Sequence, residues 1–210
     1  MIARLFLLGL LVAMPAAARP VRLCVVGDSI SEGFSPATHG WSTELGRLHA
    51  DEDFGVKNTA HSGDKVAAAR ILFDRNVVGR GCTHVAILIG TNDLPDGTSA
   101  DAIFTAIDSM ASAAEEDGAK VLLLGVLPRG TGAAWSSDLQ ARLVALNGKL
   151  EARSGSLYVD TYTALLEPAS SPPALASAAG GAADGLHPNN AGQAMIAQAV
   201  EAAVLAAGGW

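Results

Sequence analysis

Five short runs of mostly aliphatic residues alternate with amphipathic stretches along most of this chain. Most of the runs carry no polar alternation, which is typical of parallel strands covered on both faces. The runs are Val21–Val26, Gly55–Asn58, His84–Ile89, Lys120–Val126 and Leu157–Asp160. This order predicts a three-layer α/β/α sandwich with a five-stranded parallel sheet and right-handed crossovers.

The stretches between the runs predict the helices that cover this sheet. In the segment Ser99–Asp117, apolar residues recur at steps of three and four and therefore share one helix face. Ser137 and Gln140 form a possible capping box ahead of a second helix with four evenly spaced leucines. A last helix is expected from Asn189 to about Ala207.

The first 18 residues have the pattern of an export signal. Arg4 precedes the apolar run Leu5–Met14, which is too short to span a bilayer. A proline then ends the run, and Ala16–Ala18 has the small side chains that signal peptidase reads. We expect cleavage after Ala18, a single domain over residues 19–210, and a secreted or periplasmic protein with no membrane span after cleavage.

Charge and cysteine content exclude several classes of function. The formal net charge is −7, the isoelectric point is about 5.1, and no Lys/Arg cluster occurs, so we expect no nucleic-acid partner. Two cysteines alone supply neither a disulfide framework nor a structural zinc site. If the first and third strands end together at Gly27 and Gly90, Cys24 and Cys82 are several residues out of step. We therefore expect two free thiols.

Polar residues follow three of the predicted strands, at the sheet edge where ligands bind in folds of this kind. The first strand leads into Gly27-Asp28-Ser29-Ile30, the second into His61-Ser62-Gly63-Asp64, and the third into Gly90-Thr91-Asn92-Asp93. Each motif alone is also an ordinary turn. A serine hydroxyl can act as a nucleophile, whereas a glycine N–H and an asparagine amide can donate to an oxyanion.

The segment Asp184-Gly185-Leu186-His187-Pro188 precedes the last predicted helix. A hydroxyl nucleophile needs a base, usually histidine, and the base needs an acid that fixes its tautomer. Asp184 lies three residues before His187 and meets that need. Asp160, at the end of the fifth strand, is a second candidate for the acid. The other four histidines lack such a paired aspartate and are expected to be structural or peripheral; they are His39, His49, His61 and His84.

Together these segments resemble the SGNH, or GDSL-type, hydrolase family over nearly the whole chain after residue 18. Ser29, Gly63, Asn92 and His187 match that family's quartet in order. The resemblance implies a flavodoxin-like fold with Ser29 as nucleophile, His187 as base and Asp184 as its partner. It also implies an oxyanion hole formed by the N–H groups of Ser29 and Gly63 and the side-chain amide of Asn92. The expected reaction is hydrolysis of carboxylic esters through an acyl-enzyme, with no metal or cofactor.

Two other α/β families do not fit the residues. A general α/β-hydrolase carries its nucleophile in Gly-x-Ser-x-Gly, but position 31 is serine. A dinucleotide-binding fold needs Gly-x-Gly-x-x-Gly. The near match that begins at Gly130 has Trp135 where the third glycine should be.

The loops expected to line the substrate site contain few bulky apolar side chains. These loops are Ser31–Trp41, Leu94–Thr98, Leu127–Trp135 and Glu167–Ala183, and their bulky apolar residues are chiefly Phe34, Leu94, Leu127 and Trp135. This favours a short acyl or O-acetyl group on a small-molecule, carbohydrate or lipid ester. A thioesterase, a lysophospholipase, an O-acyltransferase and a carbohydrate-binding protein with a silent site remain alternatives. The sequence does not determine the oligomeric state.

Overall fold

The computed structural model describes residues 20–50, 52–130, 135–171, 173–180 and 184–210. The expected signal peptide, residues 1–18, therefore lies outside the described residues. Among the residues described, no helix has the length and apolar character needed to cross a membrane.

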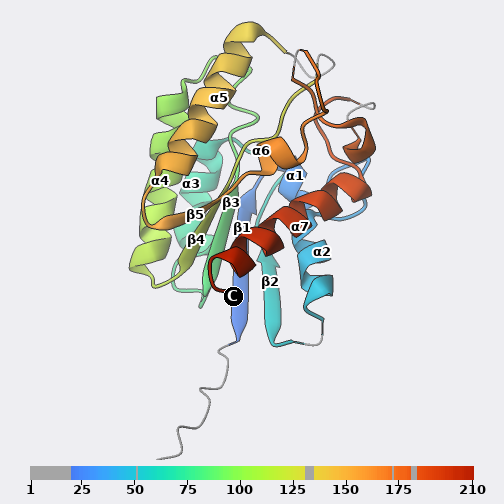
Figure 1. Ribbon diagram of the computed structural model, residues 1–210. Coiled ribbons are helices and arrows are strands. Elements are labelled where there is room, and N and C mark those ends of the chain that lie inside the picture. Colours follow the sequence, from blue (N-terminus) through green and yellow to red (C-terminus); the bar gives the residue numbers. More distant parts are fainter. Residues whose placement is uncertain (1–19, 51, 131–134, 172, 181–183) are drawn as a thin grey trace, which may run out of the picture.

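A five-stranded parallel sheet forms the centre of the molecule (Figure 1). Its strands are β1 (Val21–Gly27), β2 (Phe54–Asn58), β3 (His84–Leu88), β4 (Lys120–Leu124) and β5 (Ser156–Val159). They lie in the order β2-β1-β3-β4-β5, and every neighbouring pair is parallel. The predicted fold class is confirmed, and each predicted strand is present with ends that differ by at most two residues.

Five longer helices cover the two faces of the sheet. They are α2 (Trp41–Leu48), α3 (Val66–Asn76), α4 (Ala100–Glu116), α5 (Ser137–Ala152) and α7 (Asn190–Ala206). Three short helical turns complete the described structure: α1 (Ser29–Glu32), α6 (Thr161–Ala164) and the 3₁₀ turn η1 (Ser177–Ala179).

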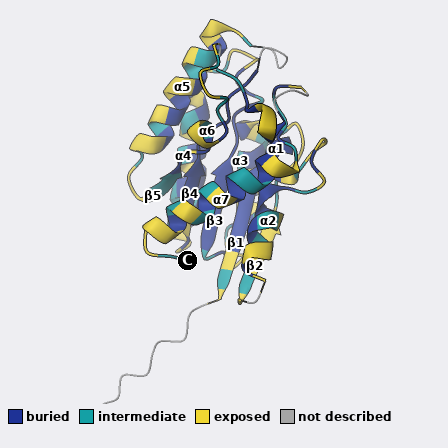
Figure 2. Ribbon diagram, turned by 45° about the vertical axis from the view of Figure 1, so that its right-hand side comes forward, coloured by how far each residue is buried: buried dark blue, intermediate teal, exposed yellow. Residues whose placement is uncertain are grey.

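Alternate residues of the strands supply two separate cores. Cys24 and Val26 of β1 face α3, α4 and α5, whereas Leu23 and Val25 face α2 and α7. This alternation follows from the period of two along a strand. Figure 2 shows β1, β3 and β4 largely buried between helices whose outer sides are exposed, whereas the edge strand β2 is mostly exposed.

The start of α5 differs by one residue from the predicted cap. Ser136, not Ser137, is the N-cap, because its hydroxyl accepts the N–H of Leu139 at 3.0 Å. Leu139 therefore occupies the third helical position, and a capping box with Gln140 does not form. The side chain of Gln140 instead donates to the hydroxyl of Tyr162.

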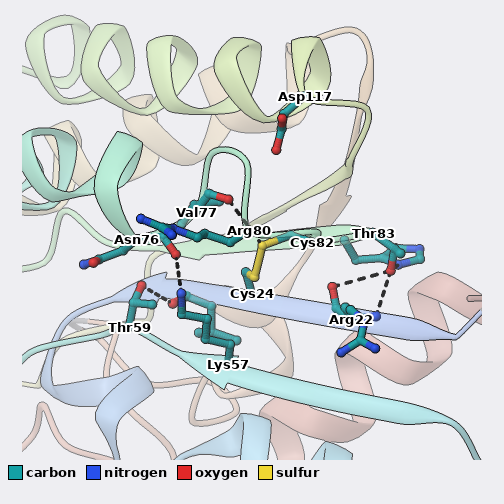
Figure 3. The surroundings of a disulfide bond; sticks show 12 residues. Arg22, Cys24, Lys57, Thr59, Asn76, Val77, Arg80, Cys82, Thr83 and Asp117 are labelled. Atoms are coloured by element: carbon teal, nitrogen blue, oxygen red, sulfur yellow. Dashed lines mark hydrogen bonds between the residues drawn. A yellow bond between two sulfur atoms is a disulfide. The ribbon is translucent and has the colours of Figure 1, made fainter.

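The prediction of two free thiols is wrong, because Cys24 and Cys82 form a disulfide (Figure 3). Gly27 pairs with Leu88 rather than Gly90, so the two cysteines are less out of step than we assumed. Cys82 also lies before β3, after a turn in which Gly79 and Gly81 have positive φ. The chain therefore reaches β3 from the side of α3, and the two Cα atoms are only 5.8 Å apart.

Candidate active site

Ser29 is the first residue of α1, directly after β1. The preceding Asp28 caps this turn, because its carboxylate accepts the N–H of Ile30 at 3.0 Å. Gly27 allows the tight passage from strand to helix: a Cβ there would lie 2.7 Å from the carbonyl oxygen of Leu88. Since Ser29 opens the helix, its own N–H has no acceptor within α1.

The loop before α7 brings His187 to this serine from 158 residues away in the chain. His187 Nε2 lies 2.9 Å from Ser29 Oγ, and His187 Nδ1 lies 2.7 Å from Asp184 Oδ2. The nucleophile, base and acid suggested by the sequence are therefore in direct contact.

Asp184 is held in place by its own loop. Its Oδ1 accepts the N–H groups of Leu186 and His187, each at 2.8 Å. Partial burial favours the neutral acid, but the hydrogen bonds from His187 and Leu186 outweigh it and lower the pKa of Asp184. The carboxyl group is therefore ionised at neutral pH and can stabilise a positive charge on the imidazole.

The two other expected oxyanion donors lie on neighbouring turns. Gly63 follows β2 with a φ of 82°, a conformation that favours glycine. Asn92 follows β3 and donates its side-chain amide to the carbonyl oxygen of Asp64 at 2.9 Å, which ties the two turns together. The amide carries a second N–H that this bond does not use.

Asp160, the alternative acid, has another role. Its carboxylate caps α6 by accepting the N–H of Thr163 at 2.9 Å. The structure thus places Asp184, and not Asp160, against His187.

The other four histidines are spread over the molecule. His39 contacts Glu44, and His49 contacts both Glu52 and Glu201. These two histidines thus have glutamate partners in place of the paired aspartate that was sought in the sequence. His84 is buried near the amino end of β3, and His61 is exposed in the turn after β2.

Arg129 is a buried cation beside the site that we did not predict. It follows β4, is only 4% exposed, and donates to both the carbonyl oxygen and the hydroxyl of Thr91. It also interacts electrostatically with Asp28 and Asp184, so its charge links the loops of nucleophile, acid and Asn92. A charged residue shortly after the apolar run of β4, at the sheet edge where ligands bind, was the signal that could have identified it.

Asp28 is a buried carboxyl group that interacts electrostatically with this cation. Burial raises its pKa to about 7, although the N–H of Ile30 opposes the shift.

The loop after β4 and the loop that carries Asp184 pack closely against each other at two glycines. Gly130 donates its N–H to the carbonyl oxygen of Gly185 at 2.8 Å. A Cβ on Gly185 would lie 3.2 Å from Gly130 Cα, so this close approach requires glycine.

The apolar surroundings of the site are sparser than the sequence indicated. Leu94 and Leu127 are fully buried and do not line it, which corrects our expectation for these two residues. Phe34 is half-exposed, with its ring centroid 5.1 Å from that of His187. Of the described residues, no group of three or more His, Cys, Asp or Glu side chains is placed to hold a metal ion.

Comparisons with known proteins identify a family for this chain. The sequence model of the GDSL-like Lipase/Acylhydrolase family matches residues 25–195. The chain is 36% identical over 119 residues to Esterase TesA of Pseudomonas aeruginosa, an alignment that covers 55% of this chain and 59% of that esterase. It therefore spans less than two thirds of the relative's length.

Solved structures show the same likeness. A crystal structure of TesA superposes with a TM-score of 0.70 at 27% identity and covers 87% of this chain and 97% of its own. A GDSL-like lipase from Bacteroides thetaiotaomicron superposes with a TM-score of 0.71 at 24% identity, covering 89% and 88% of the two chains. With the family match over most of its length, the chain belongs to the GDSL-like lipase/acylhydrolase family.

Proposed function

We propose that this chain hydrolyses carboxylic esters, with Ser29 as nucleophile, His187 as general base and Asp184 as the acid that orients it. The observation that carries the proposal is the 2.9 Å separation of Ser29 Oγ from His187 Nε2. Membership of the family and the likeness to an esterase support the same reaction.

The contacts of His187 suit proton transfer. Asp184 accepts a hydrogen bond from Nδ1–H, so the neutral ring keeps its proton on Nδ1 and presents the lone pair of Nε2 to the serine hydroxyl. Ser29 Oγ attacks the ester carbonyl carbon while its proton moves to Nε2, and Asp184 stabilises the imidazolium that results. The tetrahedral intermediate then collapses as Nε2 returns the proton to the departing alcohol. Water attacks the acyl-enzyme with the same base, which releases the acid and restores Ser29.

The N–H groups of Ser29 and Gly63 and the amide of Asn92 are the proposed donors to the oxyanion. Two of these donors come from the backbone, and Asn92 is fixed by its bond to Asp64. Donors that are already oriented stabilise the developing charge without reorganisation during the reaction.

A short acyl group is the substrate class that we propose. Leu94 and Leu127 are buried, Trp135 is partly buried, and Phe34 is a bulky apolar side chain whose ring lies close to that of His187. A fatty acyl chain needs a long apolar surface to pack against, whereas an acetyl group needs very little apolar surface.

A series of p-nitrophenyl esters from acetate to palmitate tests both parts of the proposal. We expect the highest kcat/KM for acetate or butyrate, loss of activity in Ser29→Ala, and unchanged activity in the matched control Ser137→Ala. Hydrolysis that persists in Ser29→Ala would refute the nucleophile, and a palmitate optimum would refute the small acyl site. Added alcohol measures acyl transfer, and a rate above release to water would identify an acyltransferase instead.

We also propose that residues 1–18 are a cleaved signal peptide and that residues 19–210 form a single exported domain. The Cys24–Cys82 disulfide supports export, since such bonds persist mainly in oxidising compartments. Mass spectrometry of the protein released from expressing cells should find Arg19 at the N-terminus. An intact Met1 on exported protein would contradict the cleavage.

A further inference from the structure

A cavity of about 320 Å³ lies at the amino ends of β3, β4 and β5, below the C-terminal end of α7. Ser29 lies at the opposite, carboxyl end of the sheet, so this cavity is separate from the proposed active site (Figure 1). Its volume is at the lower end of the range of about 300–1,000 Å³ that is typical of small-molecule sites. Its lining includes His84, Lys120, Leu122, Leu157, Val204 and Ala207.

The register of the sheet puts the polar and apolar parts of this lining on one face. His84 pairs with Lys120, and Leu122 pairs with Leu157. Because Lys120 and Leu122 are two residues apart, their side chains point to the same side of β4, toward α7. The cavity therefore has apolar walls from the strands and from Val204, with two nitrogen-bearing side chains at one end.

His84 lines the cavity beside the ring of Trp210, whose centroid lies 5.2 Å from that of His84. The side chain of His84 is 5% exposed, and its Nε2 has no hydrogen-bond partner among the described residues. The Thr83 hydroxyl accepts the N–H of Arg22, and its own proton has two acceptors in reach: the carbonyl oxygen of Arg22 at 3.4 Å and His84 Nδ1 at the shorter distance of 3.0 Å. With Nδ1 as acceptor, the neutral ring carries its proton on Nε2. A buried N–H donor without an acceptor costs free energy that a bound acceptor would recover.

Lys120 adds a positive charge on the same side of the sheet. Burial and Lys120 together lower the pKa of His84 to about 4, so the ring is neutral at pH 7. The nearby carboxylate of Glu201 is already engaged by His49 and Trp210. An N–H donor and an ammonium group at the end of an apolar cavity suit an acceptor with a negative charge and an apolar tail.

We propose that this cavity binds an aliphatic monocarboxylate. The carboxylate accepts from His84 Nε2 and Lys120 Nζ, and the alkyl chain lies against Leu122, Leu157 and Val204. Water alone would satisfy His84 but would leave these apolar walls hydrated. The proposal does not depend on the esterase function.

Titration of the full chain with octanoate, followed through the ring signals of His84 by ¹H–¹³C NMR, tests this site. We expect a saturable shift of the His84 signal that remains when Ser29 is blocked by a phosphonate, while the ring of His49 is unchanged. Lys120→Met should weaken octanoate about tenfold or more, since a hydrogen bond to a charged group is lost. Octanol, which has the same tail without the charge, should bind more weakly than octanoate.

Two further variants complete the test. Leu157→Trp should fill the cavity and abolish the shift. His84→Phe keeps a ring but has no N–H, so it should bind octanoate more weakly than the wild type in isothermal titration calorimetry. This second variant keeps the proposal testable if Leu157→Trp does not fold. A His84 signal that never saturates would overturn the proposal. Equal affinity of Lys120→Met and the wild type, equal affinity for octanol, or shifts confined to His187 would also overturn it.

Discussion

The two ends of the sheet each hold a histidine with limited exposure, but their neighbours differ. At the carboxyl end, both nitrogens of His187 are engaged, one by the hydroxyl of Ser29 and one by the carboxylate of Asp184. At the amino end, His84 contacts the hydroxyl of Thr83 through one nitrogen, and the nearby charge is the cation of Lys120. The first arrangement supports a positive imidazole, and the second opposes it. The comparison shows that the contact with Asp184 equips His187 to act as a base, whereas burial first and Lys120 second keep the ring of His84 neutral.

The two ends also differ in what their residues contribute. The proposed catalytic groups follow different strands and meet in loops, so conservative changes there should alter activity with little effect on folding. The disulfide and His84 lie toward the amino end, so changes there should alter stability and leave catalysis intact. Each of the following variants tests this division.

The largest effect is expected from Asp184→Asn, which should lower kcat on a short-chain ester by about 10⁴-fold. The asparagine oxygen can still accept the N–H groups of Leu186 and His187, so the unfolding midpoint should change little. Asp160→Asn is the matched control, because asparagine also caps a helix well and the carboxylate of Asp160 accepts the N–H of Thr163 in that role. A loss of kcat of tenfold or less in Asp184→Asn, or a large loss of kcat in Asp160→Asn, would show that Asp184 is not the acid that orients His187.

Removal of the disulfide should have the next largest effect, on stability. Replacing both Cys24 and Cys82 by alanine releases a cross-link between residues 58 positions apart. The free energy of unfolding in urea should fall by about 4 kcal/mol, because the unfolded chain regains the entropy of that loop. The folded fraction should keep its kcat. A parallel loss of kcat in fully folded protein would break the division between the two ends.

Asn92→Ala tests the oxyanion donors and should lower kcat by about 10²–10³-fold, or about 3 kcal/mol of transition-state stabilisation. The effect should appear in kcat more than in KM, because the charge develops only in the transition state. Asn92→Asp, which keeps the shape but loses the donor, should be equally slow. Full activity in either variant would remove Asn92 from the mechanism.

His84→Gln should have the smallest effect, and only below neutral pH. The pKa of His84 is lowered to about 4, so as the pH falls the unfolded chain takes up this proton before the folded protein does. The folded protein therefore loses stability between about pH 6.5 and 4, by about 2 kcal/mol from pH 7 to pH 5. Urea denaturation at both pH values should show a smaller loss in His84→Gln. An identical loss in the two proteins would mean that His84 does not titrate in this way.

The sequence was sufficient for the sheet and for the candidate catalytic residues. Strands buried on both faces need aliphatic runs, and those runs located β1 and β3 to within one residue. Ser29, Asn92 and His187 were recognisable because each follows or precedes an element at the edge where such sheets bind ligands.

The features that we missed depend on geometry that a linear pattern does not contain. The disulfide required the register of β1 against β3 and the course of the turn through Gly79 and Gly81. Predicting that Leu94 and Leu127 are buried requires the three-dimensional packing of their loops against the rest of the chain. Arg129 is recognisable as part of the site only from its hydrogen bond to Thr91 and its electrostatic interaction with Asp184, which the structure provides.

Covalent labelling with a fluorophosphonate tests the proposed catalytic unit most directly. The account predicts one phosphonyl group per chain, found by mass spectrometry on the peptide that contains Ser29. Labelling should be lost in Ser29→Ala and strongly slowed in His187→Ala. A label on another serine, or equally fast labelling without His187, would contradict the proposed role of the Ser29–His187 contact.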